Sequence, residues 1–198
     1  MDQLYLQGQL PPSILISRDG NDNRGSSPIF DPQYFDGPNG KVGTLIGAEL
    51  PQVIKSRYRT LNDPKFWAMG GVSSGGWGAY NIGLRHLNSL HIFFSHSGYF
   101  TDSSGAENSP NQFIQQFPTA QLQVIRGYLD AGQSDPDFLA STQQFHQTLN
   151  RLGVANQFQA FLGGHGLTGA DFGWNYFHKH LADSLSYVGK QFHQAGVR

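Results

Sequence analysis

The sequence contains no cysteine among its 198 residues, which excludes disulfide bonds, thiolate metal ligands and a cysteine nucleophile. Charged residues make up only 14% and the formal net charge is -1, so the chain offers no basic surface for a nucleic-acid backbone. No run approaches the roughly 18 apolar residues that span a bilayer, and no signal-peptide pattern follows Met1. We therefore expect neither a nucleic-acid partner nor a membrane span. The sequence leaves localisation and oligomeric state open.

Hydrophobic residues make up 38% and aromatic residues 13%, and we expect residues 1–198 to form a single domain around one core. Short apolar runs alternate with segments of helical periodicity. We expect strands near residues 12–17, 66–69, 90–94, 123–129 and 157–162, and helices from 44, from 79, through 113–117, over 136–152 and over 173–192. Pro51 is expected to kink the first of these helices. The alternation predicts an α/β fold, a three-layer sandwich in which helices cover both faces of a mostly parallel sheet.

A serine flanked by glycines follows the second expected strand, in the run Gly71-Val72-Ser73-Ser74-Gly75. The Gly-x-Ser-x-Gly pattern is a weak signal alone, but here it stands between a strand and a helix, the sharp turn that exposes a nucleophilic serine. Ser73 is therefore the candidate nucleophile. The backbone N–H of Ser74, at the helix N-terminus, is a candidate donor to an oxyanion. The alternative is that Ser73 only caps the helix.

A serine hydroxyl needs a base to take its proton, and the base needs an orienting carboxylate. Asp135 follows the fourth expected strand and His165 follows the fifth. The order serine, acid, histidine is that of α/β hydrolases, and a parallel sheet places all three at the same edge. Asp135 is also suited to cap the next helix, and Asp130 or Asp137 is an alternative acid. His96, at the end of the third expected strand, is interpreted as part of the wall of the site.

These features resemble the esterase D family of α/β hydrolases, which includes formylglutathione hydrolases, feruloyl esterases, enterobactin esterases and mycolyltransferases. The segments that carry the resemblance are residues 14–23, 49–54, 57–60, 71–79, 97–100, 132–135 and 163–165. The resemblance covers nearly the whole chain. It implies that Ser73 is the nucleophile, His165 the general base and acid, and Asp135 its orienting carboxylate. The implied reaction needs no metal and no organic cofactor.

The resemblance also implies a departure at the front of the chain. Residues 1–12 resemble the end of a helix that relatives place before the strand at 12–17, so Met1 falls inside a helix. The first strands of relatives, and their His-Gly loop with the second oxyanion donor, have no counterpart here. We therefore expect an N-terminally truncated α/β-hydrolase domain in which the strand leading to Ser73 lacks its usual neighbour.

The sequence thus predicts a serine carboxylic-ester hydrolase that works through an acyl-enzyme on a small-molecule or carbohydrate-linked ester. Tyr99, Phe100 and Trp174 are expected to line the substrate pocket, with the polar stretch 101–117 as a wall. Two alternatives remain. One is a non-catalytic binding domain that keeps the triad, and the other is an acyltransferase that uses the same triad with an alcohol acceptor.

Overall fold

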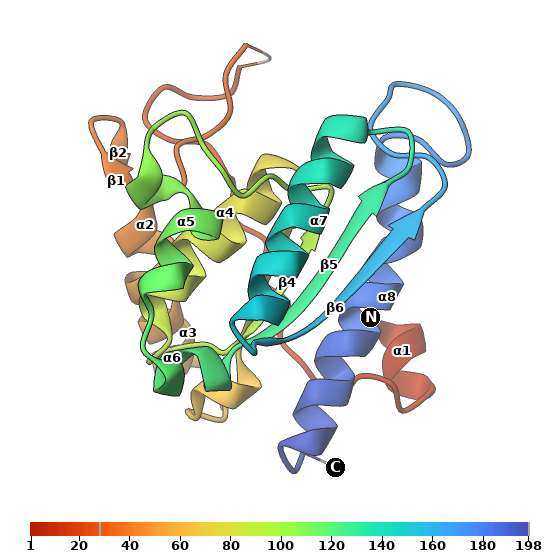
Figure 1. Ribbon diagram of the computed structural model, residues 1–198. Helices are drawn as coiled ribbons and strands as arrows, with labels where there is room; N and C mark the ends of the chain where they lie inside the picture. Colours follow the sequence, from red (N-terminus) through yellow and green to blue (C-terminus); the bar gives the residue numbers. More distant parts are fainter. Residues whose placement is uncertain (28, 198) are drawn as a thin grey trace.

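The computed structural model describes residues 1–27 and 29–197, and a four-stranded parallel sheet forms its centre (Figure 1). The strands are β3 (Ala68–Val72), β4 (Ile92–His96), β5 (Arg126–Gly132) and β6 (Ala155–Phe161), in that spatial order. Each strand pairs in parallel with the next one along the chain, and each connection contains a helix. The α/β prediction is confirmed, and all carboxyl ends of the strands share one edge of the sheet.

Helices cover the two faces of the sheet, and each face has its own apolar core. On one face, α4 (Ser74–Gly83) and α7 (Pro136–Arg151) pack through side chains such as Tyr80 and Phe145. On the other face, α8 (Trp174–Gln194) and α1 (Asp2–Leu6) pack through Leu185 and Leu4 against Ile92. None of the helices within the described residues is both long and apolar enough to span a membrane.

The remaining elements are short. They are β1 (Asp36–Gly37), β2 (Gly40–Lys41), α2 (Val42–Thr44), η1 (Leu45–Glu49), α3 (Leu50–Arg57), η2 (Pro64–Phe66), η3 (Leu84–His86), η4 (Ala106–Asn108), α5 (Pro110–Phe113), η5 (Ile114–Gln116) and α6 (Thr119–Val124). The segments α2, η1 and α3 form one continuous helical stretch, and η1 is a π-helical turn that directly precedes the Leu50-Pro51 pair. Proline has no N–H for the carbonyl four residues earlier, and a π-turn accommodates that loss.

The strand expected at 12–17 is not formed. Ile14, Leu15 and Ile16 are 49%, 62% and 39% exposed, and the segment carries no strand assignment. A strand needs a neighbour for its backbone N–H and C=O groups, and the sheet ends at β3, whose outer edge pairs with no strand in the described chain. The prediction from the apolar run was therefore wrong, because a strand forms only where a neighbouring strand pairs with it.

Strand boundaries also differ from the prediction. β3 does not end at Met69 but continues through Gly70 and Gly71 to Val72. A side chain at Gly70 would overlap the Phe94 ring, so the glycine belongs inside a packed strand here and does not mark a break. The strand expected from 123 begins at Arg126, because the residues just before it form the helix α6 that the pattern did not reveal.

Candidate active site

Ser73 occupies the turn between β3 and α4 in a strained backbone conformation, with φ 53° and ψ -124°. Such values are costly for a residue with a Cβ and persist only where the surroundings enforce them. The N–H of Ser73 donates to the carbonyl of His96 at 2.8 Å, and its own carbonyl accepts from the N–H of Gly76 at 2.9 Å. The Ser73 hydroxyl makes no capping hydrogen bond to α4. The helix-cap alternative therefore does not account for this serine.

Small residues make this turn possible. A Cβ on Gly71 would overlap the backbone of Gly75, and a Cβ on Gly76 would overlap the hydroxyl of Ser95 on β4. The first turn of α4 can therefore lie directly against the ends of β3 and β4. Because α4 begins at Ser74, that residue's backbone N–H lies at the positive end of the helix dipole, the position predicted for the oxyanion donor.

Asp135 and His165 are brought together as predicted. The Nδ1 atom of His165 lies 2.8 Å from Oδ2 of Asp135, and the backbone N–H of His165 donates to the same oxygen at 2.7 Å. Asp135 is 8% exposed and makes no side-chain bond to the N-terminus of α7, which follows it. Its carboxylate therefore bonds His165 and does not cap the helix. A Cβ on Gly164 would overlap this carboxylate, which explains a glycine next to His165.

The imidazole of His165 is fixed on three sides. Its ring stacks on Phe138 with centroids 4.3 Å apart and meets the edge of Phe177 at 5.3 Å. With Nδ1 bonded to Asp135, the remaining nitrogen, Nε2, is buried and has no hydrogen-bond partner within the described residues. A buried polar atom without a partner is unusual, and this nitrogen is available to accept a proton. No hydrogen bond joins Ser73 to His165 in the part of the chain that the structure describes.

The two alternative acids are not close partners of His165. Asp137 is exposed in the first turn of α7. Asp130 is fully buried and pairs instead with His96, whose Nδ1 lies 2.6 Å from Oδ2 of Asp130. Residues His96 and Asp130 stand directly opposite each other in the register of β4 and β5. Among the three candidate carboxylates, only Asp135 contacts the histidine at the sheet edge.

The His96–Asp130 pair belongs to a buried network that the sequence analysis missed. Nε2 of His96 lies 2.9 Å from the hydroxyl of Ser184 on α8, and the Tyr176 hydroxyl donates to Asp130 at 3.1 Å. The set of Asp130, His96 and Ser184 has the composition of a catalytic triad, but all three side chains are fully buried. The Ser184 hydroxyl also bonds the Leu181 carbonyl inside α8 at 3.0 Å. No substrate reaches this set, so we interpret it as a link between α8 and the sheet.

His96 therefore does not form part of the pocket wall, and that interpretation is corrected. Burial, followed by the negative charge of Asp130, raises the pKa of Tyr128 and of Tyr176 well above the ordinary value. Ser184 is a polar position within the buried stripe of α8. That position, together with the paired strand-end residues His96 and Asp130, is the signal that could have revealed the network.

The three predicted lining residues differ in their surroundings. Phe100 is fully buried and stacks on Phe145 at 4.1 Å, so it belongs to the core and not to a pocket wall. Trp174, at the start of α8, is 78% exposed and meets Phe177, the neighbour of His165. Tyr99 stacks on Trp77 at 5.4 Å.

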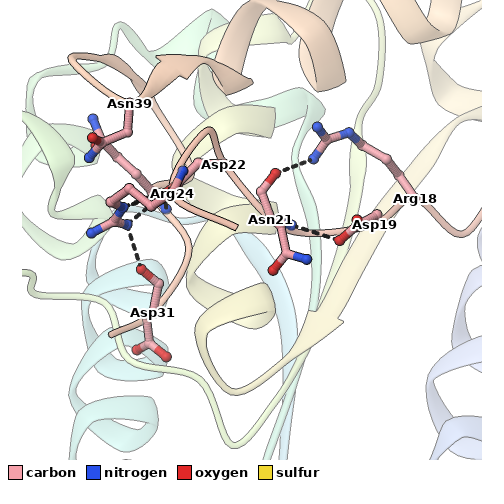
Figure 2. A network of polar contacts seen from close by, with 8 residues as sticks. Arg18, Asp19, Asn21, Asp22, Arg24, Asp31 and Asn39 are labelled. Atoms are coloured by element: carbon pink, nitrogen blue, oxygen red, sulfur yellow. Dashed lines mark hydrogen bonds and ion pairs between the residues drawn. The ribbon is translucent and has the colours of Figure 1, made fainter. Parts of the chain in front are cut away.

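A cavity of about 320 Å³ lies beside Tyr99, and its lining residues are Arg24, Asp31, Pro32, Gln33, Phe35, Trp77, Tyr99, Asp102 and Ser103. Figure 2 shows the polar contacts that hold its outer loop. Arg24 bonds the carboxylate of Asp22 and the carbonyl of Asp31 (Figure 2). The Asp31 carboxylate accepts from the Tyr99 hydroxyl at 3.0 Å. The Arg24 guanidinium holds the pKa of the Asp22 carboxyl well below its usual range. The loop is thereby tied to the residues that follow β4.

Across the described residues, no cluster of three or more histidine and acidic side chains is arranged to hold a metal.

Comparison with known proteins identifies the family. The family model described as "Putative esterase" matches residues 3–188. The chain belongs to this esterase family. Its α/β-hydrolase fold is shared with a ferulic acid esterase of 26% sequence identity, with a TM-score of 0.81 over 97% of this chain and 76% of that one.

More distant structures share the fold. Enterochelin esterase from Shigella flexneri is 18% identical, with a TM-score of 0.66 over 93% of this chain and 44% of its own. S-formylglutathione hydrolase from Staphylococcus aureus is 15% identical, with a TM-score of 0.62 over 77% of this chain and 65% of its own. An uncharacterised protein of Corynebacterium glutamicum is 23% identical over 172 residues, or 77% of this chain. The chain spans 39% of the length of that curated relative.

Proposed function

We propose that the protein is a serine carboxylic-ester hydrolase that works through an acyl-enzyme, with Ser73 as nucleophile, His165 as base and Asp135 as orienting acid. The observation that carries this proposal is the state of His165. One of its ring nitrogens is held by a buried carboxylate, while the other is buried and has no hydrogen-bond partner among the residues that the structure describes. A strained serine whose hydroxyl makes no capping bond to α4 stands at the same edge of the sheet. This is the combination that nucleophilic catalysis requires.

In the proposed reaction, the Ser73 oxygen attacks the ester carbonyl while Nε2 of His165 takes its proton. Asp135 keeps the imidazole in the tautomer that accepts at Nε2 and stabilises the imidazolium that forms. The backbone N–H of Ser74 donates to the oxyanion of the tetrahedral intermediate. The imidazolium then gives its proton to the departing alcohol, which leaves an acyl-enzyme. Water then attacks the acyl carbonyl while the same nitrogen takes its proton. The imidazolium returns that proton to the Ser73 oxygen as the acid leaves, which restores the free enzyme.

We further propose that the substrate is a small-molecule or carbohydrate-linked ester that lies between Tyr99 and Trp174. These side chains flank the proposed catalytic histidine through Phe138 and Phe177, respectively. The polar cavity beside Tyr99 provides room for groups distant from the ester. Aromatic walls with a few polar groups are the usual lining of small-molecule sites.

Labelling with a fluorophosphonate probe tests the function directly, because the probe reacts only with an activated serine. We expect the wild-type chain and the control S56A, which changes an exposed serine on α3, to label at the same rate. We expect S73A not to label. If wild type labels no faster than S73A, the hydrolase proposal fails and the chain is better described as a binding domain. If it labels and turns over esters only with an added alcohol acceptor, the activity is acyl transfer.

A further inference from the structure

The side chain of Tyr34 packs against α4 at two glycines, Gly75 and Gly78. A Cβ on Gly78 would overlap the Tyr34 ring at the end where the ring joins the main chain. The hydroxyl end of the same ring lies nearer the helix N-terminus, 4.0 Å from the position that a Cβ on Gly75 would take. The ring therefore runs along one turn of α4, from Gly78 toward the turn that carries Ser73.

Further contacts fix Tyr34 in this position. Its carbonyl accepts a hydrogen bond from the side chain of Asn81, which is 1% exposed, at 3.0 Å. Its ring meets Trp77 edge-on, with centroids 6.0 Å apart. On the outer side, a methyl group on Gly20 would lie only 2.5 Å from the phenol oxygen. The backbone and the ring are thus held by separate contacts, and a larger residue than glycine at position 20 would crowd the hydroxyl.

The hydroxyl itself is free. It makes no hydrogen bond within residues 1–27 and 29–197, although the carbonyl of the same residue and the neighbouring Trp77 indole are both bonded. Burial raises the pKa of Tyr34 above its ordinary value. The negative charges of Asp31 and Asp19 add to this rise, and the positive charge of Arg18 opposes it. The phenol consequently keeps its proton through the neutral and mildly alkaline range and remains a donor there.

An acyl-transfer site needs more than one donor to its oxyanion, and removing one costs about 10²–10³ in turnover. The proposed hydrolase mechanism identifies only the Ser74 N–H in this role, and tyrosine hydroxyls act as oxyanion donors in other enzymes. We propose that the Tyr34 hydroxyl donates the second hydrogen bond to the oxyanion formed on Ser73. This proposal rests on the proposed ester hydrolysis, and it makes Tyr34 a catalytic residue that contacts the reacting oxygen.

The substitution Y34F tests the proposal, because it removes the hydroxyl and keeps the ring on Gly78. We expect kcat for a chromogenic ester to fall about 10²-fold, with KM changed less than threefold and the melting temperature unchanged. The matched control is Y58F, which removes the hydroxyl of a 53% exposed tyrosine. A second measurement compares an ester with its thionoester, whose sulfur accepts hydrogen bonds poorly. Y34F should lower the preference for the ester.

The outcomes separate this proposal from the function on which it rests. If wild type labels with the fluorophosphonate and Y34F retains its kcat and its ester preference, Tyr34 is not an oxyanion donor while the hydrolase proposal stands. If Y34F loses activity together with thermal stability, and the ester-to-thionoester ratio is unchanged, its role is structural and the proposal is wrong. If wild type does not label, both proposals fail together.

Discussion

The two ring nitrogens of His165 have opposite surroundings, and this difference decides what each substitution near it should do. Nδ1 is bonded to Asp135, which also accepts from the His165 backbone N–H, whereas Nε2 has no partner in the described chain. Asp135 thus fixes both the tautomer and the orientation of the ring. An asparagine at this position would keep the shape but would place an N–H₂ group or a weaker acceptor against Nδ1.

We expect D135N to lower kcat by about 10³–10⁴ with little change in KM, because the imidazole would adopt the wrong tautomer. The control is D137N, which changes an exposed carboxylate two residues away in the first turn of α7. Steady-state kinetics on a chromogenic ester measures both variants. Equal activity of D135N and D137N would show that Asp135 is not the orienting acid.

At the scale of elements, α8 is attached to the sheet by polar contacts as well as by its apolar stripe. Ser184 bonds the buried His96, whose carbonyl in turn accepts the N–H of Ser73. A buried donor or acceptor that loses its partner costs about 1–3 kcal/mol. The network therefore stabilises the strand ends that hold the strained turn.

We expect S184A to lower the free energy of unfolding by about 1–3 kcal/mol, because the buried Nε2 of His96 would lose its hydrogen-bond partner. The control S186A removes a hydroxyl that bonds Gln9 at the surface of α8, and we expect its stability to stay within about 0.5 kcal/mol of wild type. Urea unfolding curves measure both. The fluorophosphonate labelling of S184A should persist below its unfolding transition; loss of labelling in a fully folded S184A would contradict a purely structural link.

The elements also show how far sequence reasoning reaches. The alternation of strands and helices, the Ser-Asp-His order and the Asp135–His165 contact could be predicted, because they depend on local pattern and on strand order. Whether residues 12–17 form a strand could not be predicted, because strand formation depends on a paired neighbouring strand that local sequence does not reveal. The burial of Phe100 and the packing of Tyr34 against α4 also could not be predicted, because both depend on contacts between segments far apart in the sequence.

At the scale of the whole molecule, two half-buried histidines make stability depend on pH. Burial lowers the pKa of His86 and of His91 from the ordinary value of 6.5. Each ring therefore takes up a proton more readily in the unfolded chain than in the folded one. Their stabilising effect is complete above pH 6.5 and is lost as the pH falls. The lowered pKa of Asp22 adds a second loss at more acidic pH, below the unfolded value of about 3.9.

We expect the free energy of unfolding to decrease from pH 7 to pH 5 and to decrease again below pH 4. The double variant H86Q/H91Q should flatten the first decrease and leave the second. D22N should leave the first and reduce the second, to which the lowered pKa values of Asp36 and Asp63 also contribute. Urea unfolding at a series of pH values measures both. A stability curve that rises between pH 7 and pH 5 would contradict the assignment to the histidines.

The glycines of β3 and α4 bear on which residues homologues should retain. Side chains at Gly70, Gly71, Gly76, Gly78 and Gly83 would each overlap a neighbouring ring, hydroxyl or backbone atom, whether or not any reaction takes place. Substitution of these glycines would therefore disturb the packing around α4 even in a chain without activity, whereas the proposed roles of Ser73 and His165 matter only to the reaction. Among homologues, we therefore expect the glycine pattern to follow the fold, and the serine and histidine together to follow the proposed activity.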